Sequence, residues 1–585
     1  MTNADVAALF EHLADLLEYE GENQFRIRAY RSAARTIAAE TESLAAIRHS
    51  TTRSLADLEG IGRDLAGKIE TILESGRLPA LDELSARVPA VVFDLFRIPG
   101  LGPKKVRQLV QSLGIDSLDG LEAACRAGLV RGMRGFGEKT EASILKNLAF
   151  VRSTVQERLL WEEADAILAR LLVWMESCPG LDRIEGAGSW RRGCETVGDI
   201  DVLAISLSPA TVMDHFHHWQ ETSEVIAAGD TKSSIRGPGG VQIDLRVIPP
   251  ASFGAAWQYF TGSKEHNIRV RSRARERGLS LNEYGIHSLV VTPDVFPTLP
   301  AATEEDVYSA VGLPWIPPEL REGRGEIHLA AEGLLPALIT VADIRGDLHM
   351  HTTDTDGEDT LAEMVRGAIE RGLEYIAITD HSQRVTMAHG LDETRLRRQW
   401  ERIDLLNEAL AADGASPIVV LKGIEVDMLE KGGLDLPDRV LEDAEWVVAS
   451  LHYGQGQPRA QITSRILEAV EHPAVSVIGH PTGRLINRRP AYDVDMEAVV
   501  EAAARTGTFL EINATPRRLD LNDLHAAAAQ RAGVAIVIST DAHSIRGLGA
   551  MGCGVLQARR AGLQAADVVN TLPLAALRSL LRSRH

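Results

Sequence analysis

The sequence is poor in cysteine and has no long apolar runs. Its four cysteines, at positions 125, 178, 194 and 553 of 585 residues, are too scattered to form a metal-binding pair or a disulfide framework. No stretch approaches the ~20 apolar residues of a membrane span, and the amino terminus lacks a basic region followed by an apolar core. These absences exclude a disulfide-rich secreted module and a membrane protein. We therefore expect a cytoplasmic protein.

The length and the charge distribution indicate several domains and one local basic surface. A chain of 585 residues is long enough for several domains that each have their own core. The net charge of −20 argues on average against a nucleic-acid partner. The segment from Lys264 to Arg277, however, contains six cationic residues and only two acidic ones. Because a binding face is local, this basic strip is compatible with nucleic acid; the alternative is a solvated helix face.

Three aspartates lie in two apolar runs. Asp199 and Asp201 are two residues apart, so in a strand both carboxylates leave on one face, and a neighbouring strand could bring Asp244 beside them. Three carboxylates this close repel one another unless divalent cations lie between them. Oxygen-only ligands suit Mg²⁺ or Mn²⁺. The pattern predicts a two-metal site for phosphoryl transfer.

A glycine-containing turn precedes the aspartate pair. Gly188 and Ser189 are followed by Arg191 and Arg192, which reads as a tight turn that opens a helix. Free backbone N–H groups and a guanidinium at such a turn would hold a triphosphate. An isolated Asp-x-Asp is common in exposed strands, but here it occurs together with the turn, two arginines and a third acid. The whole set is typical of nucleotidyltransferases.

Three related segments in the first 140 residues share two glycines ahead of a helix. Such glycines let a phosphate approach the N–H groups of the next helix, with lysines beside it. One Gly-x-Gly is more often a plain turn, but the three in tandem resemble helix-hairpin-helix motifs, and this resemblance implies binding to the DNA backbone without reading its sequence. The candidate DNA-binding residues are Gly60, Gly62, Gly100, Gly102, Lys104, Lys105, Gly135, Gly137 and Lys139.

Lys68 lies on the helix after the first of these turns. A lysine with a lowered pKa could form a Schiff base with an open-chain abasic sugar, which would be a lyase activity. A phosphate contact or an ordinary surface lysine is an equal alternative.

The carboxy-terminal half repeats a strand and a helix about seven times, and most of the strands end in an acid or a histidine. This predicts an α/β barrel with its site at the carboxyl ends of the strands. One such histidine would more often be structural, but nine candidates at these positions indicate a metal centre. They are His349, His351, Asp356, His381, Glu425, His452, His480, Asp541 and His543. The strand Phe509–Asn513 has no obvious ligand.

Residues 1 to about 320 resemble DNA polymerase beta and its family X relatives, through Gly188–Asp201, Asp244, and Tyr259 to Arg271. The resemblance implies that Asp199, Asp201 and Asp244 are metal ligands, with Asp244 beside the primer 3′ hydroxyl. It assigns nucleotide binding to Gly188, Ser189, Arg192, Tyr259, Phe260, Gly262, Lys264, Asn267 and Arg271. Lys68 matches the family's Schiff-base lysine. Asp64 and Lys264 stand where polymerase beta has the opposite charge.

The nine carboxy-terminal residues resemble the ligand set of the PHP (polymerase and histidinol phosphatase) domain. The likeness implies one metal at His349, His351, Glu425 and Asp541. Glu425 would bridge to a second metal at His452 and His480, and the remaining ligands would surround a third. Mixed imidazole and carboxylate ligation suits Mn²⁺, Zn²⁺ or Fe²⁺.

The sequence thus predicts a multidomain protein with an all-α helix-hairpin-helix amino-terminal part, an α+β nucleotidyltransferase palm and a distorted seven-stranded α/β barrel. The expected boundaries are 1–80 for a lyase-like helical domain, 81–150 for the second and third hairpins, and 151–250 for the palm. A thumb follows at 251–320, a linker at 321–342 and the PHP domain at 343–585.

We expect a bacterial gap-filling DNA polymerase of base-excision repair fused to a 3′-end-processing phosphoesterase. Its partners would be gapped or nicked DNA and deoxynucleoside triphosphates, with no membrane, and we expect a monomer. The metal site could act as a 3′–5′ exonuclease, a 3′ phosphatase or an AP endonuclease. The rival is a repair nuclease or phosphatase whose polymerase part mainly delivers DNA. A DNA-binding scaffold with decayed sites is disfavoured, because no ligand in either cluster is missing.

Overall fold

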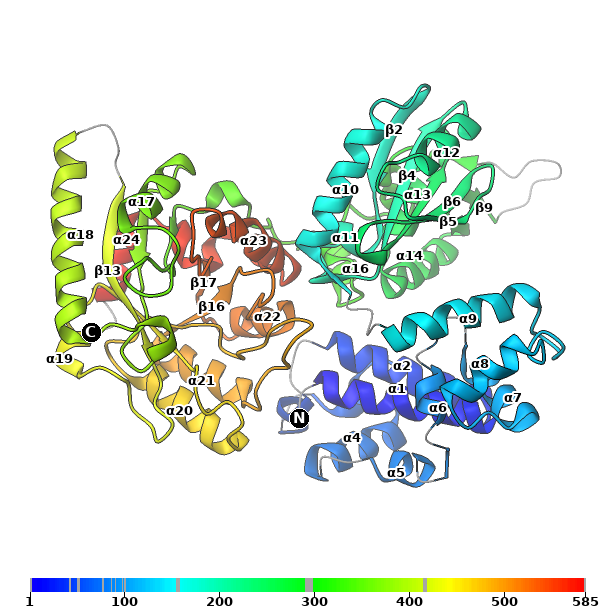
Figure 1. Ribbon diagram of the computed structural model, residues 1–585, viewed down its shortest axis with the longest axis horizontal. Helices are drawn as coiled ribbons and strands as arrows, with labels where there is room; N and C mark the ends of the chain where they lie inside the picture. The colour runs from blue at the N-terminus through cyan, green and yellow to red at the C-terminus, as the bar shows by residue number, and fades with distance from the viewer. Residues whose placement is uncertain are drawn as a thin grey trace. The chain divides into compact units, whose positions relative to one another are not determined.

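The protein divides into two compact units, residues 1–157 and 158–585 (Figure 1). The computed structural model describes the chain except for residues 1–2, 41–43, 50–52, 76–77, 86, 90, 97, 99–100, 154–157, 290–297, 414–417 and 583–585. Among the described helices, none is both long and apolar enough to cross a membrane.

The first unit is helical throughout its described part, as the sequence predicts. Its helices are α1 (Asn3–Glu20), α2 (Gln24–Ala39), α3 (Leu44–His49), α4 (Arg63–Ser75), α5 (Pro79–Ser85), α6 (Val91–Phe96), α7 (Pro103–Leu113), α8 (Leu118–Arg126) and α9 (Glu138–Ser153). Their apolar faces share one core, in which the rings of Phe10 and Tyr30 meet edge to face at 5.7 Å. The glycine-containing turns lie before α4, α7 and α9.

A five-stranded mixed sheet lies near the start of the second unit. Its strand order is β2 (Leu181–Gly186), β4 (Asp199–Ser206), β7 (Gln242–Val247), β6 (Lys232–Arg236) and β5 (Glu224–Ala227). Strands β4 and β7 run parallel, and the other neighbours are antiparallel. Ile200 and Ile243 are fully buried in the core formed with α10 (Trp161–Met175) and α12 (Pro209–His217). Because side chains alternate along a strand, the aspartates of β4 leave on the other face.

A smaller segment with its own core follows. It contains α13 (Phe253–Thr261), α14 (Lys264–Glu276), β8 (Leu279–Asn282), β9 (Gly285–Ser288), β10 (Thr298–Leu299), α15 (Glu304–Ala310) and α16 (Glu326–Glu332). Arg321 is fully buried and binds Glu304 through both terminal nitrogens, at 2.6 and 2.9 Å. Glu326 lies 2.6 Å from the buried ring of His266. The first part of residues 321–342, where the sequence suggests a linker, therefore packs onto this segment.

The remaining residues form a nearly closed barrel of parallel strands, which confirms the predicted fold. Its strands follow in chain order as β11 (Gly346–Asp347), β12 (Tyr375–Ile378), β13 (Val419–Asp427), β14 (Trp446–Ser450), β15 (Val477–Ile478), β16 (Phe509–Asn513) and β17 (Ile536–Ser539). A parallel bridge between Met350 and Ala542 links the extensions of the first and last strands. All carboxyl ends therefore meet at one end of the barrel.

Helices surround this barrel (Figure 1). They are α17 (Leu361–Glu370), α18 (Glu393–Asp413), α19 (Asp438–Leu441), α20 (Arg459–Glu471), α21 (Met496–Thr506), α22 (Asp523–Arg531), α23 (Met551–Arg560) and α24 (Leu574–Arg582). Apolar residues of the strands and helices form a large core, in which Ile376, Ile424 and Ile538 are fully buried, and a smaller one that includes Tyr375 and Trp446. This packing leaves the loops at the carboxyl ends of the strands to carry polar side chains.

Candidate functional site

Strands β4 and β7 bring the three aspartates to one edge of the mixed sheet. The parallel register pairs Asp201 with Asp244 and Asp199 with Gln242, whose amide donates to Asp244 Oδ1 at 2.8 Å. The pKa of Asp201 is raised to about 7, mainly because the carboxyl group is buried and also because of the negative charges of Asp199 and Asp244. Mutual repulsion of this kind is relieved by a proton or by a divalent cation. The donor set is all oxygen, which fits Mg²⁺ or Mn²⁺.

The predicted glycine turn lies directly against this carboxylate group. It forms the single-turn helix α11 (Gly188–Arg191), and Ala187 N–H donates to the backbone oxygen of Asp201 at 2.8 Å. Gly188 has φ +65°, and a Cβ there would lie 2.5 Å from Asp201 Oδ2. Only glycine fits this position. Ser189 follows Gly188 in this turn and is half-buried.

Arg192 is held by two oxygens from the following segment. Its Nη1 donates to Thr261 O at 2.6 Å, and its Nε donates to Glu322 Oε1 at 3.0 Å. The side chain is 15% exposed. A Cβ on Gly262, where φ is +73°, would lie 3.1 Å from Arg192 Nη1. The guanidinium is thus positioned beside the turn but already has a carboxylate partner.

The residues expected around the nucleotide sugar and base lie on α13 and α14. The rings of Tyr259 and Phe260 meet at 84° with centroids 5.2 Å apart. Asn267 donates from Nδ2 to Tyr259 O at 2.8 Å, and the Arg271 guanidinium lies 5.9 Å from the Tyr259 ring. Lys264 is exposed at the start of α14. The structure therefore brings Phe260, Asn267 and Arg271 together around Tyr259.

The hairpin glycines of the first unit have the geometry of tight turns. Gly60 and Gly135 have positive φ angles of 76° and 88°. The residues directly before α4, α7 and α9 are Gly62, Gly102 and Gly137. Lys104 is 70% exposed, Lys139 is exposed, and Lys105 lies over the Phe136 ring. The predicted Gly100 lies outside the described residues.

Lys68 lies on α4 and has a close partner that the pattern did not reveal. Its ammonium forms an ion pair with Asp64, one helical turn earlier, and stands 5.8 Å from the Tyr30 ring centroid. A nucleophilic role requires Lys68 to leave this ion pair.

The nine carboxy-terminal candidates gather at the carboxyl ends of the barrel strands, around Glu425. One oxygen of Glu425 lies 3.1 Å from His480 Nε2, 3.4 Å from His349 Nε2 and 3.5 Å from His452 Nε2. Its other oxygen lies 2.6 Å from His381 Nδ1. Glu425 is 1% exposed. Glu425 therefore belongs to two groups of side chains that could each hold a metal ion, one with His349 and His351 and the other with His381 and His452.

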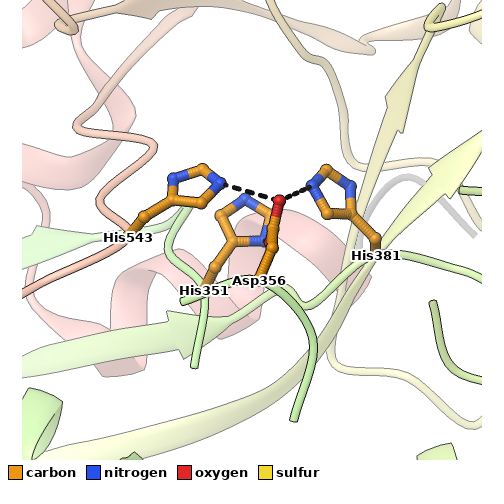
Figure 2. Close-up of side chains that lie close together, drawn as sticks. All are labelled: His351, Asp356, His381 and His543. Atoms are coloured by element: carbon orange, nitrogen blue, oxygen red, sulfur yellow. Dashed lines mark ion pairs between the residues drawn. The ribbon is translucent and has the colours of Figure 1, made fainter. Parts of the chain in front are cut away.

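A second group surrounds Asp356, which Figure 2 shows between two imidazoles. Asp356 Oδ2 lies 3.5 Å from His381 Nε2 and 3.5 Å from His543 Nε2. His351 completes this group, and one ligand atom from each of the four lies within 4.8 Å of the others. Asp541 Oδ1 lies 3.1 Å from His351 Nε2 and 3.8 Å from His543 Nδ1. The sequence assigned His351 to the first metal only, whereas here it faces both groups.

The donor atoms fit divalent metal ions. In the described residues, buried ring nitrogens without a hydrogen-bond partner include His349 Nε2, His351 Nδ1 and His480 Nδ1. The pKa of His351 is lowered to about 3, mainly because the ring is buried and also because of the positive charges of His543 and His381. A neutral imidazole is the form that ligates metal. Burial would raise the pKa of Glu425, but the surrounding histidines hold it well below its usual value.

Two buried acids that the sequence did not single out orient these histidines. Glu511, on the strand without an obvious ligand, lies 2.7 Å from His349 Nδ1. It also accepts a hydrogen bond from the backbone N–H of His480 at 2.6 Å. Asp427 lies 3.0 Å from His452 Nδ1 and accepts from the backbone N–H of the same residue. Such partners fix the ring orientation and leave the other nitrogen for a metal. In the sequence, the feature that could have revealed Glu511 and Asp427 is an acidic residue within an otherwise apolar strand.

Within the second unit, the barrel contacts the segment around Arg192 through a buried arginine. Arg560 Nη1 donates to Arg192 O at 2.8 Å and to Glu322 Oε1 at 2.9 Å, and its Nη2 donates to Asp523 Oδ2 at 2.8 Å. Arg324 also binds Asp523, at 2.9 Å. Glu322 thus has one partner at the candidate nucleotide turn and one on the barrel.

Comparison with known families covers both units. Residues 1–78 match the helix-hairpin-helix domain and 92–149 the SAM-like helix-hairpin-helix tandem. Residues 256–322 match the DNA polymerase beta thumb, and 347–515 match the PHP domain.

Similar curated proteins include one that aligns from end to end. The chain is 36% identical over 584 residues to the DNA polymerase/3′-5′ exonuclease PolX of Bacillus subtilis (strain 168), covering 100% of both proteins. It is 29% identical over 299 residues to DNA polymerase lambda of Rattus norvegicus, covering 47% of this chain and 49% of that protein. It is 31% identical over 236 residues to a probable phosphatase of Thermoanaerobacter sp. (strain X514), covering 38% of this chain and 89% of that protein.

The helical hairpins, the aspartate edge of the mixed sheet and the histidine-rich barrel define a family X DNA polymerase joined to a PHP domain. More particularly, the full-length similarity shows that the chain belongs to the PolX family of DNA polymerase/3′-5′ exonucleases.

Proposed function

We propose that this protein fills short gaps in DNA during base-excision repair and also trims or cleans 3′ ends. The observation that supports this most is the presence of two chemically distinct sites in the second unit. One is an all-carboxylate edge, and the other is a mixed imidazole and carboxylate cluster. A blocked or mispaired 3′ end cannot be extended until a hydrolase restores a clean hydroxyl. Fusion of the two domains supplies both steps on one chain.

In the polymerase site, Asp199, Asp201 and Asp244 would hold Mg²⁺ or Mn²⁺, with Asp244 beside the primer 3′ hydroxyl. The metals supply charge neutralisation at the transferred phosphoryl group. Ser189 and Arg192 receive the incoming triphosphate. Because Arg192 is paired with Glu322, the triphosphate exchanges one carboxylate for a phosphate oxygen at this guanidinium. Gly188 keeps the turn close to the carboxylates.

Nucleotide selection depends on Tyr259 and Phe260, which lie against the sugar. An aromatic pair at this place crowds a 2′ hydroxyl and favours deoxynucleotides. Asn267 fixes the backbone at Tyr259, and Arg271 stands beside its ring, near the nascent base pair. Lys264 and Gly262 complete this side of the pocket.

In the hydrolase site, His349, His351, Glu425 and Asp541 would hold one metal, and Glu425, His452 and His480 would hold a second. Asp356, His381 and His543 would hold a third. Mn²⁺, Zn²⁺ and Fe²⁺ all accept such mixed imidazole and carboxylate ligands. The metals supply an activated water for attack on a phosphoester. Glu511 and Asp427 keep the ring nitrogens turned toward them.

The hairpins bind gapped or nicked DNA through its phosphates, and the protein acts as a monomer. Hairpin contacts of this kind position DNA without reading its sequence. Lys68 is the candidate lyase nucleophile, with Asp64 as its counter-ion.

The test is primer extension on DNA with a one-nucleotide gap, with wild type compared with Asp244→Asn. We expect the wild type to add one deoxynucleotide and the variant to lose at least ~10³-fold in rate, because one metal ligand beside the hydroxyl is neutralised. The rival function, a repair nuclease whose first part only delivers DNA, predicts shortening without extension in both proteins. Extension by the variant at the wild-type rate would contradict the assignment of Asp244.

A further inference from the structure

A cavity of about 380 Å³ opens onto the metal cluster of the barrel and is not uniformly polar. Most of the proposed metal ligands line one part of it. A different part is apolar and consists of Val385, Met387 and Ala388, here called the apolar wall. The wall belongs to the segment that directly follows the ligand His381. Metal coordination does not need such a wall, so its role concerns the rest of the substrate.

The backbone of this segment is fixed at both ends. Val385 N–H donates to Ser382 O at 3.0 Å, and Leu391 N–H donates to His381 O at 2.7 Å. The guanidinium of Arg395 donates to His389 O at 2.6 Å. The apolar wall is therefore held at a constant place relative to the cluster.

The three wall residues differ in exposure in a way that suits a contact surface. Val385 and Ala388 are buried, with 9% and 5% of their surface exposed. Met387 is 89% exposed, the largest exposed fraction among the large apolar side chains of the described residues. A thioether is flexible and polarizable, and it makes favourable contacts with aromatic rings. The position thus offers an adaptable apolar contact at the rim of a metal cavity.

A 3′–5′ exonuclease substrate has a chemical group that requires such a contact. Water attacks the last phosphodiester, the bond from phosphorus to the 3′ oxygen of the penultimate nucleotide breaks, and that oxygen takes a proton. The released 5′ nucleotide carries a sugar and a base on the far side of the phosphate. With the phosphate at the metals, the apolar wall of the same cavity offers this base a place to lie. A terminal 3′ phosphate or a baseless residue leaves that space empty.

We propose that the apolar wall binds the base of the 3′-terminal nucleotide during hydrolysis, with Met387 against the face of the ring. This inference rests on the proposed exonuclease function. It makes the site selective for phosphodiesters that bear a terminal base. Because purines and pyrimidines both present an apolar face, the contact does not distinguish among bases.

The test compares Met387→Ser with the wild type on two primers that have free 3′ hydroxyls. One primer ends in an ordinary thymidine, and the other ends in a baseless tetrahydrofuran residue. Leu405→Ser is the matched control, because Leu405 is 66% exposed on α18 and does not line the cavity. Because both side chains are largely exposed, we expect both variants to fold.

With Mn²⁺ present, we expect Met387→Ser to lower kcat/KM on the thymidine primer by about two- to tenfold, as the loss of one thioether contact with a ring implies. The rate on the baseless primer and both rates of Leu405→Ser stay at wild-type values. Equal loss on both primers would overturn the proposal, because Met387 would then only shape the metal site. Unchanged rates on both would overturn it as well. A wild type that shortens neither primer would refute the exonuclease function itself, and the wall assignment with it.

Discussion

Substitution of Arg560 by methionine should destabilise the second unit and also weaken nucleotide binding at a site on another domain. Arg560 is 8% exposed and neutralises both Glu322 and Asp523. Burial would raise the pKa of Glu322, but the charges of Arg560, Arg192 and Arg324 lower it to about 2. Methionine retains the length and apolar stem of the side chain while it removes the charge.

The magnitude follows from the charges left behind. A pKa lowered from 4.5 to about 2 corresponds to ~3 kcal/mol of stabilisation of the carboxylate. Removal of one partner from a buried ion pair typically costs about 3–5 kcal/mol. Because Glu322 keeps Arg192 and Asp523 keeps Arg324, we expect the lower end, about 3 kcal/mol in the free energy of unfolding. Glu322 would then pair more tightly with Arg192, so KM for the nucleotide should rise.

The assay is urea unfolding followed by tryptophan fluorescence, together with KM for a deoxynucleotide on gapped DNA. Arg505→Met is the control, because Arg505 is 64% exposed and its single pair with Glu471 should be worth under ~1 kcal/mol. If Arg560→Met loses no more stability than Arg505→Met and keeps the wild-type KM, the reasoning from the buried pairs is wrong. A rise in KM without any loss of stability would refute the magnitude but not the link to Arg192.

Three further predictions concern the metals and the DNA. The pKa of Asp201 is raised to about 7, so below pH 7 a proton competes with Mg²⁺ for this carboxylate. As the pH rises toward 7, the Mg²⁺ concentration needed for half-maximal extension should therefore fall by up to about tenfold per pH unit. Above pH 7 it should stay constant. A Mg²⁺ requirement that does not change between pH 6 and 8 would contradict this. Glu511→Gln should weaken Mn²⁺ activation of 3′ hydrolysis by about 10- to 100-fold, because His349 loses the carboxylate that orients it; an unchanged Mn²⁺ titration would exclude that role. Binding to gapped DNA should fall by roughly 10³ to 10⁵ between 50 and 200 mM salt if ~6 to 10 phosphates are held, and a flat response in a fluorescence titration would argue against the hairpins.

The fold was accessible from the sequence because each part has a strong local pattern. Alternation along β4 and β7 predicted which face carries Asp199, Asp201 and Asp244, and the parallel register places Asp201 opposite Asp244. The repeated strand followed by a ligand predicted a barrel with its polar side chains at one end. In both cases, a short periodicity determines the direction of a side chain.

Contacts between distant segments were not accessible in the same way. Glu511 and His349 lie 162 residues apart, and Arg560 and Arg192 lie 368 residues apart. No local pattern connects such pairs, because they are brought together only by packing of the barrel. Lys68 is a nearer case, since Asp64 is one turn away and the i, i+4 spacing could have indicated the ion pair.

The most direct test of two independent active sites uses a labelled primer at a one-nucleotide gap. Wild type, Asp201→Ala and His349→Ala are each incubated with Mn²⁺, with and without all four deoxynucleoside triphosphates. We predict that Asp201→Ala loses extension but still shortens the primer, and that His349→Ala loses shortening but still extends it. Loss of both activities in either variant would contradict two separate sites.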